Sequence, residues 1–148
     1  TQSLTGSLVL GDTVGGAFAY GRNIAYSVMQ GTTSVASGTI TCSASSTPLA
    51  ISVPGSVTGA SQLVLDGSSF LKRKINVNLT GSNQAIGSTL MQNGDVDTSG
   101  EVDAADIDQV IADFSQLANI PSDVDVNGEV DANDIDIVIA NFGGLDNP

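Results

Sequence analysis

A twenty-residue segment occurs twice in the C-terminal part of this chain, and the two copies are 28 residues apart. Residues 95–114 read DVDTSGEVDAADIDQVIADF and residues 123–142 read DVDVNGEVDANDIDIVIANF, so 15 of the 20 aligned positions are identical. A repeat of this length is one supersecondary unit, and two copies are expected to bury their apolar residues against each other. The sequence therefore predicts a small unit with pseudo-twofold symmetry.

The same region carries most of the acidic residues. Residues 94–148 hold 14 Asp and Glu and no Lys or Arg, a sum of −14, whereas residues 1–93 sum to +2, which together give the net charge of −12. A compact segment with this charge repels itself, so we expect bound cations to neutralise it. The change in composition predicts a domain boundary near Asn93, with domains over 1–93 and 94–148. The acidic balance makes nucleic-acid binding an unfavourable hypothesis.

Each copy of the repeat begins with oxygen-bearing side chains at alternate positions around a glycine. In twelve-residue loops that start at Asp95 and Asp123, Gly100 and Gly128 take position 6, where an EF-hand-type loop turns sharply. Calcium prefers six to eight oxygen ligands, and alternate positions of such a loop converge on one point. The sequence therefore predicts two Ca²⁺ ions rather than a solvated acidic hairpin. The candidate ligands are Asp95, Asp97, Ser99, Glu101 (through its backbone carbonyl), Asp103 and Asp106 in the first loop, and Asp123, Asp125, Asn127, Glu129 (likewise), Asp131 and Asp134 in the second.

A helical period follows each loop. Apolar residues recur at i, i+3, i+4 and i+7, as on one face of an amphipathic helix. The two apolar stripes are expected to pack together. They comprise Ile107, Val110, Ile111 and Phe114 in the first copy, and Ile135, Val138, Ile139 and Phe142 in the second. Val102 and Val130, at position 8 of their loops, are expected to pair the loops across a short strand.

The first 93 residues have the composition of an all-β domain, with 26 Ser and Thr and few helix formers. In Ile24, Tyr26 and Val28, apolar side chains lie two residues apart, as on one face of a strand. Turn signals such as Gly15-Gly16 and Asp66-Gly67 separate the short apolar runs. Seven runs predict an immunoglobulin-like β-sandwich of open topology, followed by a small α unit. The predicted strands are 4–10, 23–30, 35–42, 49–53, 62–65, 70–79 and 88–92.

The C-terminal residues resemble the dockerin family. The resemblance covers residues 94–144 and rests on the two near-identical calcium loops, on Asp rather than Glu at position 12, and on a helix that leaves each loop without one that enters it. It implies calcium-dependent folding, an extracellular or cell-surface setting, and binding to a cohesin partner. At positions 10 and 11, where cohesin-binding dockerins commonly carry Ser-Thr, this chain has Ala104-Ala105 and Ala132-Asn133.

The remaining polar and reactive residues do not form a catalytic set. The chain has no histidine and one cysteine, which excludes an internal disulfide and an activated Cys-His pair. Cys42 is predicted to be a buried small hydrophobe, and Asp12 and Asp66 to be turn residues. We therefore expect no enzymatic activity, and no apolar run is long enough to insert into a membrane.

The sequence leaves the roles of two surface features undecided. Lys72, Arg73 and Lys74 are predicted to form a solvated strand end, which could meet the acidic region of the same or a neighbouring chain. Asn78 lies in an N-glycosylation sequon, so a glycoprotein is one hypothesis.

Two classes of function fit these features. The first is an extracellular structural protein that binds calcium and self-assembles head to tail into a filament or surface layer, with the opening strand (residues 3–10) donated to a neighbour's sheet. The alternative is a dockerin-like anchoring module that binds a cohesin-type partner, with the β-sandwich as a spacer or carbohydrate-binding domain. With almost no spare residues between the two parts, we expect the calcium unit to be docked on the sandwich.

Overall fold

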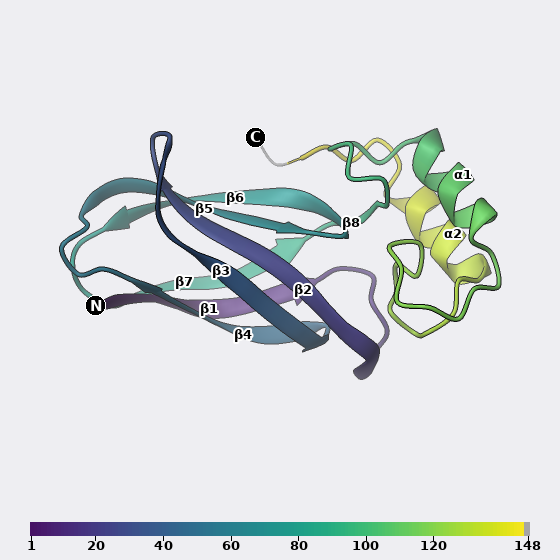
Figure 1. Cartoon of the computed structure of the whole chain (residues 1–148), viewed down its shortest axis with the longest axis horizontal. Helices are drawn as coiled ribbons and strands as arrows, with labels where there is room; N and C mark the ends of the chain where they lie inside the picture. Colours follow the sequence, from purple (N-terminus) through teal and green to yellow (C-terminus); the bar gives the residue numbers. More distant parts are fainter. Residues whose placement is uncertain (147–148) are drawn as a thin grey trace.

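The computed structural model describes residues 1–146, in which eight strands precede two helices (Figure 1). The predicted second domain, 94–148, therefore ends in two residues that lie outside the described part. The strands are β1 (Gln2–Leu10), β2 (Ala17–Gln30), β3 (Thr33–Ala44), β4 (Ser46–Val53), β5 (Gly59–Gly67), β6 (Ser69–Leu79), β7 (Gln84–Met91) and β8 (Asn93–Asp95), and the helices are α1 (Ala104–Ala112) and α2 (Ala132–Ala140).

The strands form two sheets that face each other as a β-sandwich. One sheet has the order β4-β1-β7 and the other β3-β2-β5-β6-β8. Figure 1 shows the two layers side by side, with both helices at the end opposite the N-terminus. The seven strands expected from the sequence correspond to β1–β7, so the prediction of a mainly β-sandwich with a small helical part is confirmed.

The first strand belongs to its own sandwich. β1 lies between β4, to which it is antiparallel, and β7, to which it is parallel. Leu4, Leu8 and Leu10 are at most 1% exposed in the core. In this structure the strand pairs with its own sandwich on both sides, which gives no support to its donation to a neighbour's sheet.

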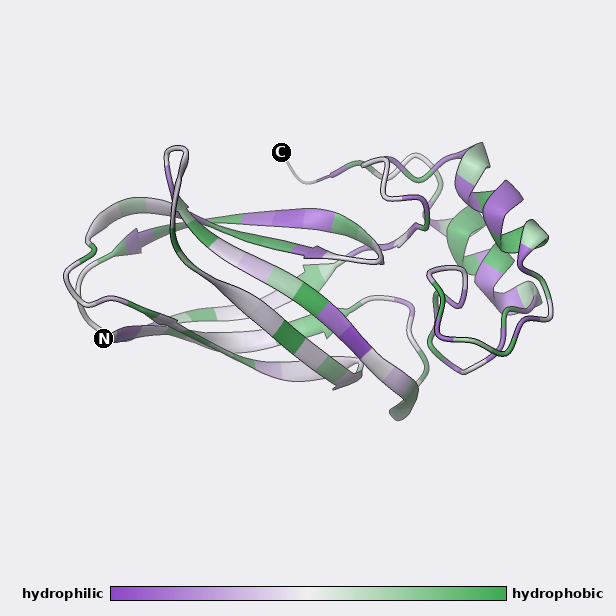
Figure 2. Cartoon of the chain, in the orientation of Figure 1, coloured by the Kyte–Doolittle hydropathy of each residue, from purple (hydrophilic) through white to green (hydrophobic). Residues whose placement is uncertain are grey.

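Two groups of buried apolar residues form the interior. The larger group fills the sandwich, and Ile24 and Val28 of β2 are fully buried there. Figure 2 shows hydrophobic and hydrophilic residues alternating along the strands, which is the pattern of a sheet with one face turned inward. The smaller group joins the helices to the sandwich, because Leu71 of β6 belongs to it; it comprises Leu71, Val96, Val102, Val110, Val124, Val130 and Val138.

The helices begin where the acidic loops end. Asp103 is the N-cap of α1, its side chain accepts from the Ala105 amide, and Asp106 completes a capping box. Asp131 and Asp134 play the same parts in α2. The four acidic residues that cap the two helices are therefore also candidate calcium ligands. Neither nine-residue helix is long enough to cross a membrane, and none of the described residues forms such a helix.

The prediction that Val102 and Val130 pair with each other is wrong. The Val102 amide donates to the Gly144 carbonyl at 2.8 Å, and the Val130 amide donates to the Gln116 carbonyl at 2.9 Å. Gln116 and Gly144 follow α1 and α2 and are themselves 28 residues apart. The pseudo-twofold arrangement therefore exists, but each loop pairs with the segment that follows the other loop's helix.

Candidate calcium sites and an apolar face

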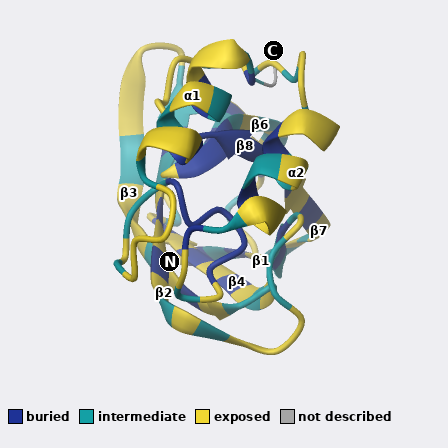
Figure 3. Cartoon of the chain, turned by 90° about the vertical axis from the view of Figure 1, so that its right-hand side faces the viewer, coloured by how far each residue is buried: buried dark blue, intermediate teal, exposed yellow. Residues whose placement is uncertain are grey.

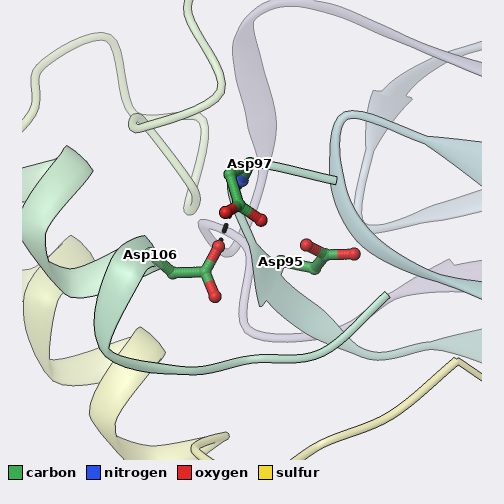
Figure 4. Close-up of side chains that lie close together, drawn as sticks. All are labelled: Asp95, Asp97 and Asp106. Atoms are coloured by element: carbon green, nitrogen blue, oxygen red, sulfur yellow. Dashed lines mark hydrogen bonds between the residues drawn. The ribbon is translucent and has the colours of Figure 1, made fainter. Parts of the chain in front are cut away.

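Three carboxylates of the first loop (loop 1, residues 95–106) converge on one point. One oxygen each from Asp95, Asp97 and Asp106 lies within 4.8 Å of the other two. Asp95 ends β8, Asp97 lies in the following turn, and Asp106 is in the first turn of α1 (Figure 4). Asp95 and Asp106 are at most 3% exposed, whereas Asp97 is exposed. These are positions 1, 3 and 12 of the predicted calcium loop.

Backbone amides of the loop hold these carboxylates in place. Asp95 accepts from the amides of Ser99 at 2.9 Å and Gly100 at 3.0 Å. One oxygen of Asp106 accepts from the Val96 amide at 2.7 Å, and the other accepts from the Asp103 amide at 2.8 Å. The first and last positions of the loop are therefore oriented by its own backbone. Gly100 has a φ of +93°, a conformation that favours glycine at this turn.

The second loop (loop 2, residues 123–134) repeats the arrangement. Asp123, Asp125 and Asp134 converge within the same 4.8 Å limit, and here all three are buried. Asp123 accepts from the Gly128 amide at 3.0 Å, and Asp134 accepts from the Val124 amide at 2.8 Å. The two clusters match in geometry and differ in their surroundings.

Burial makes these carboxylates costly to ionise. Burial raises the pKa of Asp95 to about 6, although the Gly100 hydrogen bond opposes the shift and the charge of Asp106 adds to it. Burial likewise raises the pKa of Asp134 to about 6, against hydrogen bonds from the backbone of Asp131 and Asp125. The pKa of Asp123 is also raised, mainly by burial. A divalent cation among these oxygens would offset that cost, and an all-oxygen donor set fits calcium.

The other candidate ligands lie around the clusters. Asp103 and Asp131 accept from the Ala105 and Asn133 amides at 2.8 and 2.7 Å, as expected of helix N-caps. The remaining four are at positions 5 and 7. Ser99 and Asn127 donate their amides to the position-3 carboxylates, and Glu101 and Glu129 have exposed side chains. In each loop the structure brings three of the six candidates together as carboxylates.

A second feature of the helical region is an exposed apolar surface. Six large hydrophobic side chains there are 49–75% exposed, and they form three pairs that are each 28 residues apart. We call this set the apolar face: Ile111 and Ile139, Phe114 and Phe142, and Leu117 and Leu145. Figure 3 shows exposed stretches along the outer sides of both helices. Ile111, Phe114, Ile139 and Phe142 were expected to pack between the helices, and that expectation is wrong.

Sequence reasoning missed Arg22, which lies at the contact between the sandwich and loop 2. Its guanidinium donates to the backbone carbonyls of Ile120, at 3.1 Å, and Asp123. Arg22 is 5% exposed, although it was counted only in the charge balance. The sequence did contain a signal for this role, because Arg22 is a single charged residue in an otherwise uncharged strand. The expected docking of the helical region on the sandwich is confirmed by these hydrogen bonds.

The remaining candidates have ordinary surroundings. Cys42 is fully buried as expected, and burial raises the pKa of its thiol. Asp12 accepts from the Asn141 side chain, and Asp66 lies 3.6 Å from the Lys72 ammonium, so the two carboxylates have different partners. Lys72 also meets the acidic region of its own chain, because its amide donates to Asp146 at 2.7 Å. Asn78, in the sequon, is exposed.

No protein-family model matches the sequence, and no curated protein matches it. Two solved structures share its fold: crystal structures of an N-terminal and a C-terminal interface mutant of a type II cohesin–X-dockerin complex from Acetivibrio cellulolyticus. The TM-scores are 0.72 and 0.70, the identities are 16% and 17%, and each match covers 98% of this chain and 97% of the matched chain. The likeness therefore spans both the sandwich and the helical region, and at this identity it shows the fold alone.

Proposed function

We propose that this chain is a calcium-dependent protein-binding module of the cohesin–dockerin kind. In this proposal, residues 94–146 (the helical unit) bind two Ca²⁺ ions and present the apolar face to a cohesin-type partner. The module acts outside the cell or at its surface and has no catalytic activity of its own. The observation that carries the proposal is the apolar face, whose six side chains lie at equivalent positions of a repeat that also holds two carboxylate clusters.

Calcium would act on the fold of this unit. The clusters link the start of each loop, at Asp95 and Asp123, to the first helical turn, at Asp106 and Asp134. A bound ion neutralises converging carboxylates whose mutual repulsion otherwise opposes the compact loop. Ligands from both ends of a loop fix where its helix starts, and thereby the side chains that the helix exposes. Binding of the ion is in this way coupled to the shape of the apolar face.

The apolar face has the character of a docking surface. Phe114 and Phe142 are 49% and 57% exposed, and large exposed hydrophobic side chains are typical of protein–protein interaction sites. The helical unit contains no Lys or Arg. Its acidic residues include Asp108 and Asp136 on the helices. Charge complementarity therefore favours a partner whose apolar patch is bordered by basic side chains.

The sandwich fits the role of a spacer better than that of a sugar binder. The whole chain has four Phe, two Tyr and no Trp, and Phe70 is buried, so few rings are free to stack on a saccharide. The solved structures with this fold come from complexes between different proteins. Together with the position of β1 inside its own sheet, this supports partner binding over the head-to-tail homopolymer.

Titration calorimetry with a type II cohesin domain tests the proposal, in excess Ca²⁺ and in excess chelator. We expect binding only with calcium, and we expect Phe114→Asp or Phe142→Asp to weaken it at least about tenfold. Thr32→Asp is the matched control, because Thr32 is exposed in the β2–β3 hairpin, away from the helices. Binding that survives both Phe variants would overturn the assignment of the face. Self-association of the chain in calcium, without cohesin binding, would restore the self-assembly hypothesis.

A further inference from the structure

The two loops have nearly the same sequence but different neighbours. Loop 2 contacts the connection between β1 and β2 and the beginning of β2. The Val14 amide donates to the Asp125 carbonyl at 2.8 Å, and the Ala19 amide of β2 donates to the Val126 carbonyl at 3.0 Å. Asp125 is 4% exposed as a result, whereas its counterpart Asp97 is exposed. The sandwich therefore covers Asp125 of loop 2, whereas Asp97 of loop 1 is open to solvent. Loop 1 joins the sandwich at its first residue, Asp95, because β8 pairs with β6.

A buried cation faces loop 2. Arg22 projects from β2, and its Nη2 donates to the carbonyls of Ile120 and Asp123. Ile120 precedes loop 2, and Asp123 is the first residue of the loop. Its charge lies close enough to Asp123 and Asp134 to interact with both carboxylates. Both hydrogen bonds come from one nitrogen of the guanidinium, which fixes the backbone while the delocalised charge offsets negative charge nearby. Arg22 lies outside the repeat, so the internal symmetry of the sequence does not supply an equivalent arginine to loop 1.

Asn93 adds a second anchor. Its side-chain amide donates to the Val124 carbonyl at 2.6 Å and to the Gly11 carbonyl at 3.1 Å. One buried side chain thus ties the second residue of loop 2 to the connection that follows β1. If loop 2 moved away from the sandwich, the side-chain donors of Asn93 and Arg22 and the carbonyls that they contact would lose their hydrogen bonds. Each unsatisfied buried group costs free energy.

Loop 1 has an acidic neighbour instead. The Asp146 amide donates to the Gly100 carbonyl at 2.8 Å, and a Cβ built on Gly100 would lie 3.0 Å from the Asp146 carboxylate. The segment after α2 therefore brings a further negative charge next to Gly100, in the loop that already holds Asp95, Asp97 and Asp106. The cation at loop 2, Arg22, is buried, whereas Lys72, which lines one pocket together with Asp95 and Asp146, is 38% exposed and pairs with Asp66.

We propose that Arg22 is an internal counter-ion and anchor that keeps loop 2 folded on the sandwich without calcium, so that calcium controls the conformation of loop 1. This inference rests on the proposed binding of calcium to the loops. Arg22 is a positioning residue in this scheme, because it acts through the backbone and carboxylates of loop 2. The apolar face then has a half anchored to the sandwich and a half that depends on the ion.

Hydrogen exchange of the full chain compares the loops directly, because they contain matched amides. Val96 and Val124 donate to equivalent carboxylates at 2.7 and 2.8 Å, and Gly100 and Gly128 do so at 3.0 Å each. In excess chelator, we expect protection at Val96 and Gly100 to fall at least about tenfold more than at Val124 and Gly128. Equal losses in the two loops would overturn the inference, and this comparison needs no variant.

Arg22→Met tests the residue itself, because it removes the charge and donors but keeps an apolar stem. In chelator, we expect protection at Val124 and Gly128 to fall to the level of loop 1, with loop 1 unchanged. Arg22→Lys restores the charge and one donor nitrogen but not the planar guanidinium, and it should recover part of the protection. Amides of β2 and β5, such as those of Val28 and Leu63, report whether the sandwich stays folded. Unchanged protection of loop 2 in Arg22→Met would show that Arg22 is not the anchor.

The same measurement separates this inference from the proposed function. A calcium response of equal size in both loops leaves calcium binding in place and contradicts only the asymmetry. The absence of any calcium response in either loop contradicts the proposed function as well.

Discussion

Val110 is fully buried in the helical unit, whereas Phe114, one helical turn further along the same apolar stripe, is 49% exposed. The repeat reproduces this contrast, because Val138 is fully buried and Phe142 is 57% exposed. The stripe after each loop is thus divided: its first part packs against the other helix and the sandwich, and its last part lies on the surface. The two parts should respond differently to substitution.

Removal of buried apolar groups should destabilise the helical unit much more than removal of exposed ones. For Val110→Ala, we expect a loss of about 1–3 kcal/mol in the free energy of unfolding, because it leaves a cavity in a packed site. For Phe114→Ser, we expect a change of at most about 0.5 kcal/mol, since the ring is half exposed. Denaturant unfolding with saturating calcium measures both. A larger loss for Phe114→Ser than for Val110→Ala would contradict the burial described above.

Native mass spectrometry should count two calcium ions on the chain. Asp95→Ala and Asp123→Ala each remove the first carboxylate of one cluster, so each variant should retain one ion under the same conditions, and the double variant none. Asp108→Ala is the matched control, because Asp108 is an exposed acid on α1 outside the clusters, and it should leave the count at two. Two ions on the double variant would place calcium elsewhere.

Without calcium, acidification should stabilise the helical unit. The pKa of Asp95 and of Asp134 is about 6 in the fold, above the ordinary value of 3.8. The folded chain therefore holds these protons more tightly than the unfolded chain does. The cost of ionisation is full above about pH 6 and disappears as the pH falls through 6 towards 4.

Thermal unfolding, followed by the helical circular dichroism signal in chelator, should show a higher midpoint at about pH 5 than at about pH 7. With saturating calcium the order should reverse, because protons then compete with the ion for the same oxygens. A midpoint in chelator that falls on acidification would contradict the assigned pKa directions.

Deletion of residues 1–10 should unfold the sandwich. β1 is the middle strand of its sheet, so the deletion removes the hydrogen-bonding partner of both β4 and β7 as well as three core leucines. Circular dichroism and size-exclusion chromatography of the truncated chain measure the effect. A folded truncated monomer that binds a peptide of residues 1–10 would instead support strand exchange between chains.

The sequence predicted the elements of the fold because local signals determine them. Alternating side chains such as Ile24, Tyr26 and Val28 mark strands, and Gly15-Gly16 marks the connection between β1 and β2. Asp66 and Gly67, predicted as a turn, are instead the last two residues of β5. The acidic loops were equally readable, because the spacing of Asp95, Asp97 and Asp106 is a local property of the chain. All seven predicted strands and both helices are present.

The parts that sequence reasoning missed depend on contacts between distant residues. Periodicity shows that Val110 and Phe114 share a face, but it does not show how much of that face the neighbouring helix covers. Val102 and Val130 were expected to pair because both are at position 8 of their loops, yet each pairs with a segment that follows a helix. Arg22 could not be assigned, since its partners, Ile120 and Asp123, are about 100 residues away.

The parallel pairing of β1 with β7 has a mechanical consequence. The N-terminus lies at one end of the sandwich, and the chain leaves β7 for the helical unit at the other end, so tension between the two runs along both strands (Figure 1). The hydrogen bonds between β1 and β7 lie across that direction. A pull therefore loads the whole ladder in shear and must break many hydrogen bonds together, whereas a peeling force would break them one after another. A tether attached at the N-terminus and a partner held on the helices would therefore be joined through a ladder that is loaded in shear.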